Sequence, residues 1–197
     1  MPASEQKSSR LLIFFGMVAA GKSFLARRWA ERHGCAYYNT DVVRKQLAGM
    51  MPGTRQPAGI GQGIYNPELT RRTYDELLQL ARQERDRLAG CVVLDGSYRD
   101  QGERDRIVAG IGGCKIYFIY CRCSESCIRQ RLALRAEDPA AVSDGTWEIY
   151  QMQRRQFQVP EQITGAQLLM LDTERPLPEL LEAVDNFVFG GQQPPAS

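Results

Sequence analysis

The sequence is poor in histidine and lysine and contains no long apolar run. Among its 197 residues are one histidine, His33, and only four lysines within 25 basic residues. No apolar stretch approaches the length of a membrane-spanning helix, and the polar start MPASEQKSSR is unlike a signal peptide. The net charge of +2 is too small to indicate a nucleic-acid or membrane partner by itself. We therefore expect a cytoplasmic protein with no membrane association.

The six cysteines offer little support for a metal site. The cluster Cys121-x-Cys123-x3-Cys127 lies far from the single histidine, and no second cysteine pair has ligand spacing. Buried thiols at the end of a strand explain this cluster better than zinc. In a reducing cytoplasm we expect all six thiols to be free.

Apolar runs alternate with helical patterns along the chain. This alternation predicts an α/β protein, a three-layer sandwich in which a five-stranded parallel sheet lies between helices. The length fits one domain, spanning 10–189, with disordered ends at 1–9 and 190–197. We expect strands at 11–15, 35–39, 91–95, 115–121 and 167–173, and helices at 22–32, 41–47, 67–88, 100–111, 124–136, 146–157 and 176–189.

The stretch GMVAAGKS (16–23) follows the first predicted strand and opens the first predicted helix. It has the frame G-x-x-x-x-G-K-[ST], in which backbone N–H groups surround a nucleotide phosphate. In this frame Lys22 reaches the β- and γ-phosphates and Ser23 holds Mg²⁺ through its hydroxyl. An ordinary strand–turn–helix is the alternative. The residues expected to bind ATP are Gly16, Ala19, Ala20, Gly21, Lys22, Ser23 and Phe24.

The strand CVVLD ends on Asp95. Open α/β sheets bind ligands at the carboxyl ends of their strands. If this strand lies beside 11–15, Asp95 meets the magnesium held by Ser23, directly or through water. The alternative is an aspartate that only caps the turn at Gly96 and Ser97.

Four segments beyond the phosphate loop resemble one group of small P-loop kinases. The sequence is similar to the kinase-like ATP-binding domain often fused to aminoglycoside-phosphotransferase-like proteins, which is related to gluconate kinase, the zeta toxins and phage polynucleotide kinase. The resemblance covers about 10–160 and implies a nucleoside-kinase-like P-loop fold with a helical lid. Only nine residues precede the predicted domain at 10–189, so we expect no fused partner on that side. The segments are YYNTDVVRKQLAG, IYNPELTRRTYDELLQLA, CVVLDGSYRDQGER and RLALRAEDPAAVSDGT.

The resemblance implies an acceptor region at about 41–75. Asp41 matches the carboxylate that takes the proton from the acceptor hydroxyl, and Arg44 matches the arginine that holds the acceptor. The spacing i, i+3 places both on one face of a helix. The alternative is that Asp41 only stabilises the helix dipole, with Thr40 as the N-cap.

The resemblance also implies a lid at about 129–145. Arg131 and Arg135 match lid arginines that close on the nucleotide phosphates and stabilise the charge of the transferred group. The alternative is a solvated basic face that also includes Arg129. We expect Ser143 or Asp144 to be the N-cap of the helix that follows.

Other residues are candidates for contact with the acceptor. Arg99 and Arg104 follow the Asp95 strand, and exposure at the surface is the alternative for both. The Gly- and Pro-rich segment 48–66 is expected to flex over the acceptor, with Tyr65 either lining its pocket or packing in the core.

These features together predict an ATP- and Mg²⁺-dependent kinase. Lys22, Asp41, Arg131 and Arg135 are its expected catalytic residues, and a small molecule with a hydroxyl group is its expected partner. A 5′-hydroxyl polynucleotide kinase is one alternative, although the small net charge disfavours it. The other is a non-catalytic ATP-binding sensor, which would have no need of a base at Asp41.

Overall fold

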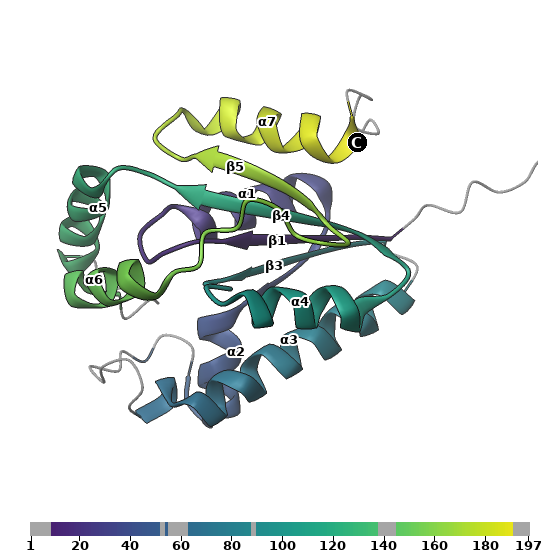
Figure 1. The fold of residues 1–197 in the computed structure, drawn as a ribbon, viewed down its shortest axis with the longest axis horizontal. Coiled ribbons are helices and arrows are strands. Elements are labelled where there is room, and N and C mark those ends of the chain that lie inside the picture. The colour runs from purple at the N-terminus through teal and green to yellow at the C-terminus, as the bar shows by residue number, and fades with distance from the viewer. Residues whose placement is uncertain (1–8, 52–53, 55–62, 88–89, 138–144, 191–197) are drawn as a thin grey trace, which may run out of the picture.

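Five parallel strands form the centre of the protein in a computed structural model (Figure 1). The structure describes residues 9–51, 54, 63–87, 90–137 and 145–190. The strand order is β2-β3-β1-β4-β5, which confirms the predicted parallel sheet. The strands are β1 (Ser9–Phe15), β2 (Ala36–Asn39), β3 (Cys91–Gly96), β4 (Cys114–Arg122) and β5 (Gln167–Asp172).

Helices cover both faces of this sheet (Figure 1). On one face pack α1 (Lys22–His33) and α7 (Leu177–Phe189), and on the other α3 (Pro67–Asp86) and α4 (Gln101–Ile111). The remaining helices lie near the carboxyl ends of the strands, where the site forms. They are α2 (Thr40–Leu47), the 3-10 turn η1 (Gly63–Tyr65), α5 (Glu125–Glu137) and α6 (Trp147–Gln156).

The central strand β1 is apolar on both faces because both faces are covered. The run Leu11–Phe15 is buried throughout, with its odd and even residues in opposite cores. In the register of β1 with β3, Phe14 lies opposite Asp95. The condition set for Asp95 is therefore met, because its strand lies directly beside the strand that leads into the phosphate loop.

The two cores meet helices whose buried faces follow a helical period. In α1 the buried residues are Leu25, Ala26, Trp29 and Ala30, whereas Phe24 is 50% exposed. Asp185 of α7 accepts the indole N–H of Trp29 at 2.8 Å. This buried bond fixes α7 against α1.

Several local expectations need correction. The N-cap of α2 is Asn39, whose side chain accepts from the backbone N–H of Asp41 at 2.9 Å, so Thr40 is not the cap. The N-cap of α6 is Thr146, and not the expected Ser143 or Asp144, which lie outside the described residues. Asn39 starts the helix at Thr40, one residue earlier than expected.

The expectation of six free thiols was also wrong. Cys35 and Cys91 form a disulfide that joins the start of β3 to the residue preceding β2. Both lie at the end of the sheet opposite the phosphate loop. The remaining four cysteines, Cys114, Cys121, Cys123 and Cys127, are free.

Parts of several predicted segments lie outside the described residues. These parts are 1–8 and 191–197 of the ends, most of the loop 48–66, and 138–144 of the lid. Ser9, expected to be disordered, belongs to β1, and Gly190 is the C-cap of α7. Within the described part of the chain, no helix combines the length and the apolar character needed to cross a membrane.

Candidate active site

The phosphate loop joins β1 to α1 in a conformation that only small residues permit. Gly16 has φ of 147°, and a Cβ there would lie 2.3 Å from the carbonyl oxygen of Cys121. Gly21 has φ of 84° and Ala19 a φ of 59°. Helix α1 begins without a side-chain cap and without an acidic residue in its first turn. Its first N–H groups are therefore available to an anion, which fits a nucleotide phosphate.

Asp95 is fully buried next to this loop. Its Oδ2 accepts hydrogen bonds from Asn39 Nδ2 and, at 2.9 Å, from the Tyr37 hydroxyl, while its Oδ1 has no hydrogen-bond partner. A buried carboxylate oxygen without a partner is suited to a cation or an ordered water. Within the described ranges, His, Cys, Asp and Glu side chains nowhere gather in threes as metal ligands. A metal here would need oxygen atoms from the nucleotide itself.

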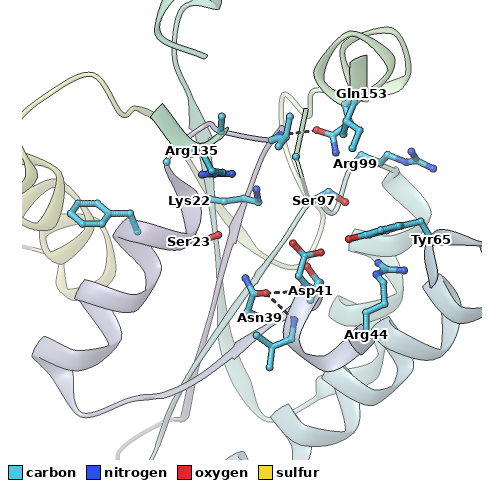
Figure 2. A pocket seen from close by; sticks show the side chains of 18 of the residues that line it. Lys22, Ser23, Asn39, Asp41, Arg44, Tyr65, Ser97, Arg99, Arg135 and Gln153 are labelled. Atoms are coloured by element: carbon cyan, nitrogen blue, oxygen red, sulfur yellow. Dashed lines mark hydrogen bonds between the residues drawn. The ribbon is translucent and has the colours of Figure 1, made fainter. Parts of the chain in front are cut away.

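A cavity of about 610 Å³ opens between the phosphate loop, α2, α3 and α6 (Figure 2). In Figure 2, Lys22 and Arg135 reach into it from one side and Asp41, Arg44 and Tyr65 from the other. Of the predicted site residues, Gly16, Ala20, Asp95 and Arg131 do not line it. Those that do are Ala19, Gly21, Lys22, Ser23, Phe24, Asp41, Arg44, Tyr65, Arg99 and Arg135.

Asp41 stands at the first turn of α2, where Asn39 caps the helix. Burial raises the pKa of its carboxyl group, and Asp95 adds to this effect, while Lys22 and Arg44 oppose it. Asp41 also opposes the lowering of the Arg135 pKa by burial. The carboxylate of Asp41 therefore faces cations from the phosphate loop, α2 and α5 at once.

Arg44 is buried one turn further along α2, with a relative exposure of 6%. Its NH1 donates to Thr70 Oγ1 at 2.8 Å, and its guanidinium lies over the Tyr65 ring, 5.2 Å from the centroid. Its Nε has no hydrogen-bond partner. Arg44 and Tyr65 both line the cavity, so this part of the site can bind a polar or anionic group of a ligand.

The two predicted lid arginines lie in different surroundings. Arg131 donates to the carbonyl oxygen of Thr173 at 2.7 Å and to its Oγ1 at 3.0 Å, and reaches the carbonyl oxygen of Ala19 at 3.3 Å. It ties the phosphate loop to the residue that follows β5. Arg135 lines the cavity beside Lys22.

The two arginines after β3 also differ. Arg99 lines the cavity and pairs with Asp100 at 3.2 Å. Arg104 is 2% exposed and donates to the carbonyl oxygen of Tyr98 at 2.7 Å. The alternative that Arg104 is exposed at the surface was therefore wrong. Its contacts are those of a residue that stabilises the β3–α4 loop.

A family model described as an AAA domain matches residues 11–160. The phosphate loop, the buried carboxylate beside it and the cavity agree with this match. The chain belongs to the AAA domain family. Curated relatives include uncharacterised proteins of Mycobacterium tuberculosis and Mycobacterium bovis, each 32% identical over 146 residues. The match covers 71% of this chain and 28% of each relative, so this chain spans less than a third of their length.

Solved structures place this AAA domain in the fold of small P-loop kinases. A sugar kinase from Janibacter superposes with a TM-score of 0.69 at 16% identity, covering 92% of this chain and 95% of that one. A gluconokinase from Sinorhizobium meliloti gives 0.59 at 17% identity, covering 94% and 98%. The APS kinase of Mycobacterium tuberculosis, solved with AMPPNP and APS, gives 0.61 at 18%, covering 92% and 98%.

Several residues that line the cavity of this AAA domain were not foreseen. They come from segments far apart in the chain and include Tyr37, Asn39, Thr70, Tyr74, Ser97, Glu103 and Gln153. Two of them had a local signal. Asn39 immediately precedes a helix, as N-caps do, and Glu103 follows Asp100 at the spacing of a capping box. For Gln153 no local pattern indicates its position.

Glu103 has unusual surroundings for a carboxyl group. Burial, together with the nearby Asp100, raises its pKa to about 7, while Arg99 opposes the shift. One of its oxygens, Oε2, is buried without a hydrogen-bond partner. A carboxyl group whose pKa is raised in this way therefore lines the same cavity as Asp41 and Arg44.

Proposed function

We propose that this chain is an ATP- and Mg²⁺-dependent kinase that transfers the γ-phosphate to a hydroxyl group of a small molecule. One observation carries the proposal. A single cavity contains the lysine of a phosphate loop and, across from it, a half-buried carboxylate, Asp41, flanked by Arg44. A phosphate site alone would suit an ATPase or a sensor, whereas a base facing that site suits transfer to a hydroxyl.

The nucleotide side uses mostly backbone groups. Backbone N–H groups of 16–23 other than that of Val18, together with the start of α1, would surround the phosphates, with Lys22 neutralising their charge. Magnesium would be held by the Ser23 hydroxyl and the phosphates, with Asp95 Oδ1 as a direct or water-mediated partner. The metal's role would be to neutralise charge on the phosphate oxygens.

The acceptor side would supply the base. The acceptor oxygen would form a bond to the γ-phosphorus, the bond from that phosphorus to the β-phosphate oxygen would break, and the hydroxyl proton would pass to Asp41. A raised pKa brings a carboxylate closer to the proton affinity that this step requires. Arg44 and Arg99 would hold the acceptor, and Arg135 would stabilise charge on the transferred group from a lid at about 129–145.

The cavity volume supports a small acceptor. About 610 Å³ lies within the range of sites for small molecules and cofactors. The similar structures include a sugar kinase, a gluconokinase and an APS kinase. Sugars and other polyols are therefore the first acceptors to test.

ADP release from ATP and Mg²⁺ tests this function. The screen would include sugars and sugar acids, nucleosides, aminoglycosides and a 5′-hydroxyl oligonucleotide, each with wild type, Asp41→Asn and the exposed control Asp75→Asn. We expect one class of acceptor to stimulate release in wild type and in the control but not in Asp41→Asn. Equal turnover in wild type and Asp41→Asn would refute Asp41 as the base and favour a nucleotide sensor.

A further inference from the structure

Helix α6 touches the phosphate loop through one side chain. The backbone N–H of Val18 donates to Gln153 Oε1 at 2.7 Å across 135 positions of sequence. Because the N–H group of Val18 is a donor, the carboxamide must face it with its oxygen and not with its NH₂ group. The NH₂ group of Gln153 is thereby turned away from Val18, and Gln153 lines the cavity (Figure 2).

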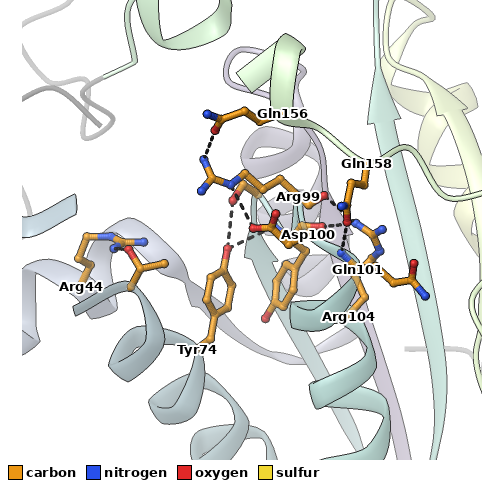
Figure 3. A network of polar contacts seen from close by, with 11 residues as sticks. Arg44, Tyr74, Arg99, Asp100, Gln101, Arg104, Gln156 and Gln158 are labelled. Atoms are coloured by element: carbon orange, nitrogen blue, oxygen red, sulfur yellow. Dashed lines mark hydrogen bonds and ion pairs between the residues drawn. The ribbon is translucent and has the colours of Figure 1, made fainter. Parts of the chain in front are cut away.

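The same segment also holds the loop on the acceptor side (Figure 3). Arg99 NH1 donates to Gln156 Oε1 at 3.1 Å, and the N–H of Gln158 donates to the carbonyl oxygen of Arg99 at 3.1 Å. Gln158 Oε1 in turn accepts from the N–H of Gln101 at 2.7 Å. Residues 153–158 thus bridge the phosphate loop and the β3–α4 loop, which fixes Gln153 between the two sides of the cavity.

The position of Gln153 matters because it shares a cavity with the residues on both sides of the proposed transfer. In the proposed reaction the γ-phosphoryl group moves from the Lys22 side toward the acceptor oxygen at Asp41. Gln153 lines the same cavity as both residues and is anchored to the phosphate loop. Because the amide oxygen is hydrogen-bonded to Val18, the NH₂ group of Gln153 is fixed in orientation. It can donate to a phosphoryl oxygen without reorganising, as preorganised donors do in transfer reactions.

We propose that Gln153 is a γ-phosphate-binding residue, whose NH₂ group donates to the phosphoryl group in transit while its oxygen stays on Val18. This inference rests on the proposed function, because it needs ATP in the loop. It adds a donor from α6 that no motif in the sequence indicates. A residue that only supports the loop would affect ADP and ATP alike, whereas a γ-phosphate ligand affects ATP alone.

Calorimetric binding of ADP and of the non-hydrolysable analogue AMPPNP, both with Mg²⁺, tests this. Gln153→Glu keeps an oxygen that accepts from Val18 but replaces the donor with a negative charge. We expect it to weaken AMPPNP more than tenfold and ADP less than threefold. Gln153→Ala removes the donor and also the oxygen that accepts from Val18, so a loss common to both nucleotides can occur, but AMPPNP should still weaken about tenfold more than ADP.

Gln151→Glu is the matched control, because it introduces the same charge on the same helix at an exposed position. We expect both affinities to stay within twofold of wild type. Equal losses for the two nucleotides in Gln153→Glu and Gln153→Ala, or no loss in either, would overturn the assignment. Wild type that binds neither nucleotide would instead overturn the proposed function, and this inference with it.

Discussion

The two sides of the cavity are built in different ways. The phosphate side is one continuous stretch, 16–23, that acts through backbone N–H groups and a single lysine. The acceptor side is assembled from side chains of α2, η1, α3 and the β3–α4 loop, with α6 between the two sides. A backbone site depends on local conformation, which short motifs encode. A side-chain site depends on which distant segments meet, so it can change its ligand while the phosphate side stays constant.

Loss of the base should separate the two sides most sharply. Asp41→Asn keeps the size of the side chain but cannot accept the proton, so we expect kcat to fall about 10²- to 10⁴-fold. The ATP affinity should stay within a few-fold, since the phosphate side is intact. Acceptor-stimulated ADP release and calorimetric ATP binding measure the two effects.

The pH profile adds a second check on Asp41. Only the ionised carboxylate can take the proton, and burial raises its pKa. The acidic limb of kcat against pH should therefore lie above the usual range of an aspartate, with activity lost as the pH falls through it. If the residual activity of Asp41→Asn showed the same acidic limb as wild type, the titration would belong to another group.

A methyl group at Gly16 should damage the phosphate side instead. The Cβ would lie 2.3 Å from the carbonyl oxygen of Cys121 at φ of 147°. We expect Gly16→Ala to cost about 2–4 kcal/mol in the free energy of unfolding and to abolish tight ATP binding. Gly34→Ala is the control, with positive φ but nothing within 4 Å, and should cost about 1 kcal/mol. Urea unfolding compares them, and equal losses would contradict the steric explanation.

Arg44→Lys should affect the acceptor side alone. It retains the charge but loses the planar guanidinium that lies over the Tyr65 ring and donates to Thr70. We expect the acceptor KM to rise about 10- to 100-fold while ATP affinity is unchanged. Arg106→Lys, at an exposed pair with Asp75, should change neither quantity. A similar loss of ATP affinity in Arg44→Lys would remove the distinction between the two sides.

Glu103→Gln should give the smallest effect, visible in stability. The folded state raises the pKa of Glu103 to about 7 from a usual value of 4.5, so folded protein keeps a proton that unfolded protein loses between these values. Wild type therefore loses stability as pH rises through this window. The variant should be more stable than wild type at pH 8 by on the order of 2 kcal/mol, and equal near pH 4.

Urea unfolding at both pH values measures the Glu103 effect. The exposed neighbour Asp105→Asn is the control and should show no such pH dependence. A constant difference between Glu103→Gln and wild type at both pH values would show that Glu103 is not titrating in this window.

Local patterns accounted for the elements and the phosphate loop, and failed where a partner from elsewhere decides the outcome. The alternation of apolar runs and helical patterns predicted all five strands, with ends within two residues. The same reasoning treated Cys35 and Cys91 as free thiols, because their proximity depends on β2 pairing with β3. The assignment of Arg131 and Arg135 to one lid came from the family resemblance, and spacing along α5 says nothing about the Thr173 carbonyl that Arg131 meets.

The sequence by itself determined the α/β class, the phosphate loop and the place of Asp95 at the carboxyl end of its strand. These follow from hydrophobic period and from glycines whose conformations few other residues can adopt. Only the tertiary structure decided that Asp41, Arg44, Glu103 and Gln153 line one cavity. Residues separated by up to 135 positions meet there, as the Val18 backbone and the Gln153 side chain do, because parallel strands bring every following loop to the same edge of the sheet.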